Sequence, residues 1–125
     1  MSDLQFIEAF RAVQKAAFNI NINKGFYDGS AGQNLGEKIA LVHSELSELL
    51  EAARKAGTHA SSDKNIDMGN GRLMTNIEEE LADVVIRCMD IAEWQNGAGL
   101  ADLGQAIIKK MAYNALRPLK NGKLF

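Results

Sequence analysis

The sequence predicts an all-α fold, a bundle of the four-helix type, in a single domain that spans residues 1–125. Four segments of the chain place apolar residues at helical spacing, and helix-capping residues precede three of them. The chain also holds only one proline, which leaves these segments uninterrupted. A domain of this length buries roughly two-thirds of the surface that its unfolded chain exposes. The chain is therefore long enough to form a core.

The first helix is predicted from about Asp3 to Phe18, where apolar side chains recur every three or four positions. Asn34 predicts the start of the second helix, and Glu37 lies three residues later as the partner of a capping box. Gly57 predicts its end, because glycine adopts the left-handed conformation that follows many helices. The polar, glycine-rich segment 57–74 comes next, with a length typical of functional or mobile loops.

The third helix is predicted to begin at a second capping box, in which Thr75 pairs with Glu78, and to end near Trp94. Asp102 predicts the start of the fourth helix, and Pro118 predicts its end because proline cannot continue a helix. The four segments follow one another without an internal repeat of domain size. They favour one helical domain.

Charge and cysteine content exclude several functions. Fourteen basic and sixteen acidic residues give a net charge of −2, which argues against binding to nucleic acid or to a membrane surface. Cys88 is the only cysteine, so no intrachain disulfide forms and a reducing compartment fits. The chain shows neither a signal-peptide pattern nor an apolar run long enough to cross a bilayer. We therefore expect a soluble, cytoplasmic protein.

Two pairs of acids occupy matching positions on the second and third predicted helices. Glu45 lies at the edge of the apolar stripe of its helix, and Glu48 lies about 60° further round. Glu80 and Asp83 repeat this arrangement on the next helix. Packing the two stripes into a common core brings the four carboxylates towards one another.

Converging carboxylates need a counterion, because two unit charges about 4 Å apart repel by about 4 kcal/mol at an effective dielectric of 20. Without a cation, some of the acids stay protonated with raised pKa values. All-oxygen ligation suits Mg²⁺ or Mn²⁺, and Mg²⁺ held by carboxylates usually completes its shell with water and phosphate oxygens. Zinc fits poorly, because the chain has only two histidines, His43 and His59, and Cys88 lies in the apolar stripe. A ferritin-like di-iron site fits poorly, because neither acidic pair is followed by a Glu-x-x-His motif. The alternative is that both pairs are solvated surface acids.

The fourth predicted helix carries Lys110, Asn114 and Arg117 in a strip about 60° wide beside its apolar stripe. Arg binds phosphate oxygens through two nitrogens, Lys supplies a point charge, and Asn bonds a sugar hydroxyl or a base edge. These residues therefore form a candidate phosphate clamp. Positive charge near a helix C-terminus also complements the helix dipole, which is the simpler interpretation.

The two acidic segments, Glu45-Leu-Ser-Glu48 and Glu80-Leu-Ala-Asp83, resemble the ExxE and ExxD motifs of the MazG-like all-α nucleoside triphosphate pyrophosphatases. The resemblance covers nearly the whole chain and is closest to short, single-domain members, including phage-type ones. It extends to residues 24–26, 36–44, 62–64, 79–87 and 110–118.

The resemblance implies a MazG-like helical bundle that assembles as a homodimer or homotetramer. It implies Mg²⁺-dependent hydrolysis of the α–β phosphate bond of a (d)NTP, which gives a nucleoside monophosphate and pyrophosphate in nucleotide-pool house-cleaning. The implied metal ligands are Glu45, Glu48, Glu80 and Asp83. The implied contacts to the triphosphate or sugar are Lys110, Asn114 and Arg117.

Other residues are assigned to the site on weaker patterns. One of the acids, Glu48 or its neighbour Glu45, orients or deprotonates the attacking water. Lys38 lies within about 20° of Glu45 on the helical wheel and is a candidate substrate contact. Trp94 either stacks on a base or packs in the core or a subunit interface. Asp90 is either a supporting acid or plain surface.

Two alternatives remain open at this point. The chain is a non-catalytic helical interaction module with solvated acids, or it resembles the phosphoribosyl-ATP pyrophosphohydrolase of histidine synthesis, which shares the general fold. Apolar residues outside the main stripes, such as Leu41 and Ile86, argue against a monomer.

Overall fold

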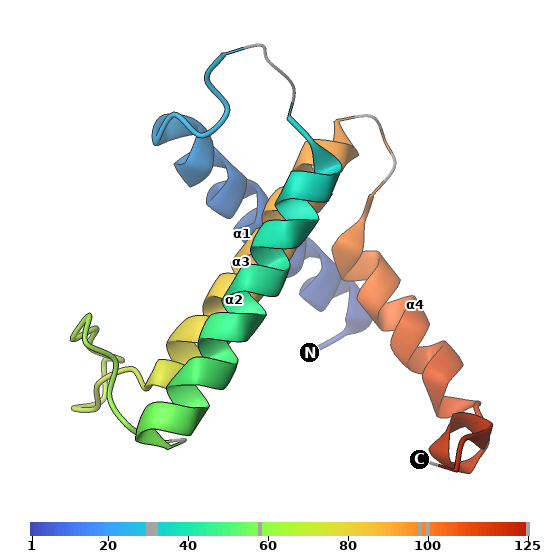
Figure 1. Ribbon diagram of the computed structural model, residues 1–125. Coiled ribbons are helices and arrows are strands. Elements are labelled where there is room, and N and C mark those ends of the chain that lie inside the picture. Colours follow the sequence, from blue (N-terminus) through green and yellow to red (C-terminus); the bar gives the residue numbers. More distant parts are fainter. Residues whose placement is uncertain (30–32, 58, 98, 100, 125) are drawn as a thin grey trace.

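The computed structural model describes residues 1–29, 33–57, 59–97, 99 and 101–124. It shows an all-α protein with four helices packed as a bundle, and no β-strand in the described part of the chain (Figure 1). The predicted helical class is therefore confirmed. The helices are α1 (Asp3–Asn23), α2 (Leu35–Ala56), α3 (Asn76–Asn96) and α4 (Leu103–Ala115), followed by the short 3₁₀ helix η1 (Leu119–Gly122).

Side-chain caps explain where the helices start. The predicted box at Thr75 forms: its hydroxyl accepts from the Glu78 backbone N–H, and the Glu78 carboxylate accepts from the Thr75 N–H. Asn34 accepts from two backbone N–H groups at the start of α2, but among the described residues no hydrogen bond runs from the Asn34 N–H to the Glu37 carboxylate. The predicted box at Asn34 is therefore wrong in its second half.

The predicted end of α1 at Phe18 is also wrong, because the helix continues to Asn23. No glycine or proline interrupts residues 19–23, and the first residue with a positive φ is Gly25 at 86°. Helix geometry therefore persists until a residue without a Cβ allows the chain to turn. This extension places Asn21 and the following segment beside α2 and α3.

The helices pack unequally. Helices α2 and α3 run antiparallel side by side, α1 crosses α3, and α4 packs against α1 (Figure 1). The α1–α4 contact is close because Gly104 faces Phe10: a Cβ at Gly104 would lie 3.2 Å from the Phe10 Cβ. Arg11 pairs with Asp102 at the same junction. Beyond this junction, α4 leads away from the α2–α3 pair.

The segment 59–74 folds back on itself. The Ser62 N–H donates to the Met74 carbonyl over 2.8 Å, and isolated bridges join Ser61 to Thr75 and Asp67 to Leu73. Both ends of this segment therefore meet at the start of α3.

Little apolar surface is buried within one copy of the chain. Among the described residues, the buried apolar side chains are Met89 and Ala92. The sequence predicted buried stripes, but Leu46 is 43% exposed, Val85 is 46% exposed and Met111 is 63% exposed. The reason is that α2 packs chiefly on α3 and α4 chiefly on α1, so their remaining faces stay uncovered. In the described part of the chain, no helix combines the length and the apolar character needed to cross a bilayer.

Candidate metal centre

Three of the four predicted acids meet between α2 and α3. Glu45, Glu48 and Glu80 each offer a carboxylate oxygen, and these oxygens all lie within 4.8 Å of one another. Glu45 is buried, Glu80 is half-buried and Glu48 is exposed. Because α2 and α3 are antiparallel neighbours, acids one turn apart on each helix face the same seam. The group is therefore buried on the side of Glu45 and open to solvent on the side of Glu48.

Glu80 has an oxygen with no partner. Its Oε2 atom is buried and makes no hydrogen bond within the described structure. Burial, followed by the charges of Glu48 and Glu79, raises the pKa of Glu80. A buried oxygen of this kind normally finds a donor or a cation. It is the feature of the group that most directly calls for a ligand.

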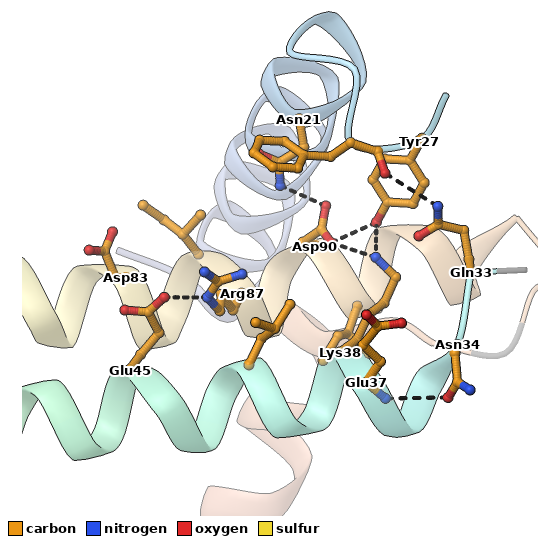
Figure 2. Close-up of a pocket in the computed structure, with 14 residues that line it drawn as sticks. Asn21, Tyr27, Gln33, Asn34, Glu37, Lys38, Glu45, Asp83, Arg87 and Asp90 are labelled. Carbon is orange, nitrogen blue, oxygen red and sulfur yellow. Dashed lines mark hydrogen bonds and ion pairs between the residues drawn. The ribbon is translucent and has the colours of Figure 1, made fainter. Parts of the chain in front are cut away.

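Asp83 lies beside this group rather than within it. Burial and the neighbouring Glu45 charge raise its pKa, although Arg87 acts in the opposite direction. Asp83 and Glu45 line the same cavity (Figure 2). The structure therefore brings the fourth predicted acid to the edge of the centre.

The donor set fits a hard divalent cation. It consists of carboxylate oxygens, which Mg²⁺ and Mn²⁺ prefer, and it includes the unpartnered buried oxygen of Glu80. Neither histidine nor cysteine belongs to the group, so it does not resemble a zinc site. Glu45, Glu48 and Glu80, with Asp83 at the edge, are the residues that could hold such an ion.

Arg87 contacts the candidate centre, and the sequence did not reveal it. Its Nε–H donates to Glu45 Oε1, and the two side chains are 40% and 9% exposed. The pair supplies the buried carboxylate with a positive partner. One signal was present in the sequence: Arg87 follows Asp83 by four residues and Glu80 by seven, which places all three on one helix face.

A cavity of about 520 Å³ opens beside the acids. It lies between α2, α3 and the segment after α1, and its size is within the range of small-molecule sites. Figure 2 shows Glu45, Asp83 and Arg87 at one end and Lys38, Tyr27 and Asp90 at the other. The cavity therefore joins a negatively charged centre to a network of polar side chains.

The polar network centres on Asp90, which is buried. Its carboxylate accepts from Asn21 Nδ2 over 2.9 Å, from the Tyr27 hydroxyl over 2.6 Å and from Lys38 Nζ over 3.3 Å. Burial, followed by the hydrogen bond to Asp90, raises the pKa of Tyr27. Asp90 is therefore not plain surface, because it ties α1 and the segment after it to α2 and α3.

Two predicted substrate contacts lie near this network. Lys38 lines the cavity, but its ammonium already bonds Tyr27 over 2.8 Å as well as Asp90. It also lies 4.2 Å from the centre of the Tyr27 ring and 5.3 Å from that of Trp94. Trp94 is half-buried and is not one of the cavity-lining residues of the described chain. Both side chains pack within one copy of the protein.

The basic strip is not brought to the acids. Lys110, Asn114 and Arg117 belong to α4 and the turn after it, and α4 packs on α1 rather than on the α2–α3 pair. The Lys110 ammonium lies 4.6 Å from the centre of the Tyr113 ring. Within one copy of the chain, the predicted phosphate clamp and the acidic centre are therefore separate.

The segment 59–74 borders the other side of the acids. The Ser62 hydroxyl is buried and donates to Glu79, and Lys64 Nζ lies 3.4 Å from the same carboxylate. A second hollow, of about 440 Å³, lies between this segment and the acids Glu48 and Glu80. The segment is therefore anchored where it can shield the acidic centre.

Comparisons with protein families, with curated proteins and with solved structures find no match for this chain.

Proposed function

We propose that this protein is a Mg²⁺-dependent nucleoside triphosphate pyrophosphohydrolase of the MazG-like type. It cleaves the bond between the α- and β-phosphates of a (d)NTP and releases a nucleoside monophosphate and pyrophosphate, in nucleotide-pool house-cleaning. The observation that carries the proposal is the group formed by Glu45, Glu48 and Glu80. This group holds a buried, unpartnered oxygen and lies beside a cavity of about 520 Å³.

Mg²⁺, with Mn²⁺ as a substitute, would be held by Glu45, Glu48, Glu80 and Asp83. When bound, the ion supplies charge neutralisation and a bound water of lowered pKa. Glu48 is the exposed member of the group, so it can reach a water molecule and take its proton. One P–O bond then forms to the water oxygen, the P–O bond on the leaving side breaks, and pyrophosphate departs.

A second copy of the chain completes the site in this proposal. Lys110, Asn114 and Arg117 lie on the helix that leads away from the acidic centre of their own copy. In a homodimer or homotetramer they meet the negatively charged centre of a neighbour and bind its triphosphate. Charge complementarity between the basic strip and the acids supports this arrangement.

The exposed apolar side chains also support assembly. They are distributed over α2, α3 and α4, and include Leu46, Leu50, Val85 and Met111. Soluble monomers rarely leave so many large apolar side chains uncovered, and self-association buries them. A non-catalytic interaction module would have the same apolar surface, so activity has to be measured directly.

The test is pyrophosphate release from a panel of dNTPs and NTPs in the presence of Mg²⁺, with phosphoribosyl-ATP in the same panel. We expect release from at least one nucleotide. Glu48→Gln and Asp83→Asn should lower it by at least about 100-fold, which is the usual contribution of a positioned acid or base. Arg54→Gln, on the exposed face of α2, is the control and should retain activity.

Two results would contradict the proposal. Activity that survives both acidic substitutions would exclude the metal centre. A folded protein that hydrolyses none of the nucleotides would favour the interaction module.

Mixing two inactive variants tests the shared site. Asp83→Asn removes an acid and Arg117→Ala removes a basic residue, so each homodimer lacks one part of every site. Co-expressed at equal levels, the two variants should recover roughly a quarter of wild-type activity, because half of the dimers are mixed and each holds one complete site. If each site used residues from one copy only, the mixture would stay inactive.

A further inference from the structure

Arg87 and Glu45 form the ion pair at the edge of the acidic centre. Glu45 is 7% exposed, so its charge needs a partner inside the protein. Arg87 supplies it through its Nε–H. The Arg87 side chain is 40% exposed and lines the cavity, so the rest of its guanidinium faces open space. One arginine therefore contacts both a candidate metal ligand and the candidate substrate cavity.

Arg87 and a divalent metal ion would compete for the Glu45 carboxylate. Glu45 belongs to the group of three acids whose oxygens lie within 4.8 Å of one another, and Arg87 already bonds one of its two oxygens. A guanidinium and a divalent cation on one carboxylate repel each other. Asp83, one turn before Arg87, forms no ion pair with it among the described residues. A guanidinium displaced from Glu45 would still lie at the cavity, where an anion could pair with it.

We propose that Arg87 neutralises Glu45 while no metal is bound. A divalent cation that binds Glu45 releases Arg87, which then binds a phosphate oxygen in the cavity. The proposal rests on the function proposed above and adds a residue and an order of events to it. Without the metal, Arg87 keeps the buried carboxylate paired. With the metal, the guanidinium binds the polyphosphate through two of its nitrogens. Metal binding thereby prepares the cavity for the substrate.

Arg87→Met tests the proposal by calorimetry, because this substitution has opposite effects on the two ligands. Titration with Mn²⁺ alone should give a Kd about 5- to 20-fold lower than in the wild type, within the usual range of coupling between two sites. Titration with the Mn²⁺ complex of inorganic tripolyphosphate should give a Kd about 10- to 100-fold higher, the usual effect of losing a charge-assisted hydrogen bond. A purely structural ion pair would weaken both.

Two further variants serve as controls. Arg87→Lys keeps the charge and should bring the affinity for Mn²⁺ back towards the wild-type value, but should restore only part of the tripolyphosphate affinity. Arg11→Met removes the same charge from the exposed pair with Asp102 on α1 and α4, and should change neither affinity.

A direct readout follows the wild-type protein and needs a variant only to assign the signal. The Nε–H signal of Arg87 in an ¹H–¹⁵N spectrum is assigned by its absence in Arg87→Lys. We expect this signal to lose its protection from solvent exchange when Mg²⁺ is added, and to regain it with Mg²⁺ and tripolyphosphate.

The outcomes separate this proposal from the function on which it rests. If the wild type binds Mn²⁺ but Arg87→Met binds it equally well or more weakly, Arg87 is not displaced, and the metal centre stands. An Arg87 signal that is unchanged by Mg²⁺ leads to the same conclusion. If the wild type binds no Mn²⁺, both proposals fail.

Discussion

Glu80→Gln removes one negative charge from the acidic centre while keeping the size of the side chain. Glu80 lies within 4.8 Å of both Glu45 and Glu48. At this distance each pair of charges repels by about 0.9 kcal/mol in water and by about 3.5 kcal/mol at an effective dielectric of 20. Glu48 is exposed and Arg87 offsets the charge of Glu45, so the repulsion in each pair is closer to the value in water. The two pairs together then give about 2 kcal/mol. We expect the metal-free variant to be about 2 kcal/mol more stable than the wild type at pH 7.5.

The pH dependence of this effect has a defined sign. The pKa of Glu80 is raised in the folded protein, so the folded state holds its proton more tightly than the unfolded state, where the pKa is about 4.3. The contribution of Glu80 to stability is therefore present below about pH 4 and is lost as the pH rises through its folded pKa. The variant lacks this loss. The difference between the two proteins should appear at pH 7.5 and vanish at pH 4.

Urea unfolding followed by circular dichroism at fixed protein concentration measures these stabilities, with EDTA or with MgCl₂. At about 100 times its Kd, Mg²⁺ should stabilise the wild type by about 2.7 kcal/mol and the variant by less than about 0.7 kcal/mol, so that the order of stability reverses. A variant that is no more stable than the wild type in EDTA at pH 7.5 would refute this reasoning. An equal gain at pH 4 would do the same.

Glu78→Gln is the matched control, two residues earlier on the same helix. The hydrogen bond from Arg72, followed by that from the Thr75 N–H, lowers the pKa of Glu78 to about 2. Its charge therefore stabilises the fold above about pH 4, and the stability it contributes is lost as the pH falls towards 2. Glu78→Gln should be less stable than the wild type at pH 7.5, opposite in sign to Glu80→Gln.

Other parts of the fold give further tests. Lys38→Met leaves Asp90 buried without its cation and should lower the free energy of unfolding by about 3 kcal/mol. Tyr27→Phe removes only a hydrogen bond to Asp90 and should lower it by about 1 kcal/mol. Equal effects of the two substitutions in urea unfolding would contradict the ion-pair assignment. Gly104→Leu should lower the melting temperature by several degrees, and Gly104→Ala by less, because α4 lies so close to Phe10. Calorimetric scans in which both variants melt at the wild-type temperature would argue against this contact. Ser62→Ala should speed protease cleavage within residues 57–74 without changing the affinity for Mn²⁺, because it frees the segment from Glu79; an unchanged cleavage rate would mean that the hydroxyl does not anchor the segment.

Local signals were sufficient to predict where α2, α3 and α4 begin and to suggest the acidic centre. Thr75 and Asp102 cap the helices that they were predicted to start, because capping depends on neighbours within one turn. The equal phase of Glu45 and Glu80 on their helices is likewise a property of 3.6-residue periodicity. Both features could be derived before any tertiary contact was known.

Long-range packing could not be derived in the same way. The Arg87–Glu45 pair joins residues 42 positions apart, and no local rule links them. The departure of α4 from the α2–α3 pair depends on its contact with α1 at Gly104, so the separation of Arg117 from the acids was not foreseen. Apolar periodicity identifies which face of a helix avoids water, but it does not say whether the same copy of the chain covers that face.

We propose that Glu45, Glu48 and Glu80 together hold a divalent cation. Crystals grown with Mn²⁺ and measured above the manganese absorption edge test it most directly, because anomalous scattering locates the ion itself. We predict a peak between α2 and α3 at about 2.2 Å from an oxygen of each of these three carboxylates, with Asp83 as a further ligand or bonded to a metal-bound water. A structure at saturating Mn²⁺ without a peak at these residues, or with manganese only at other acids, would contradict it.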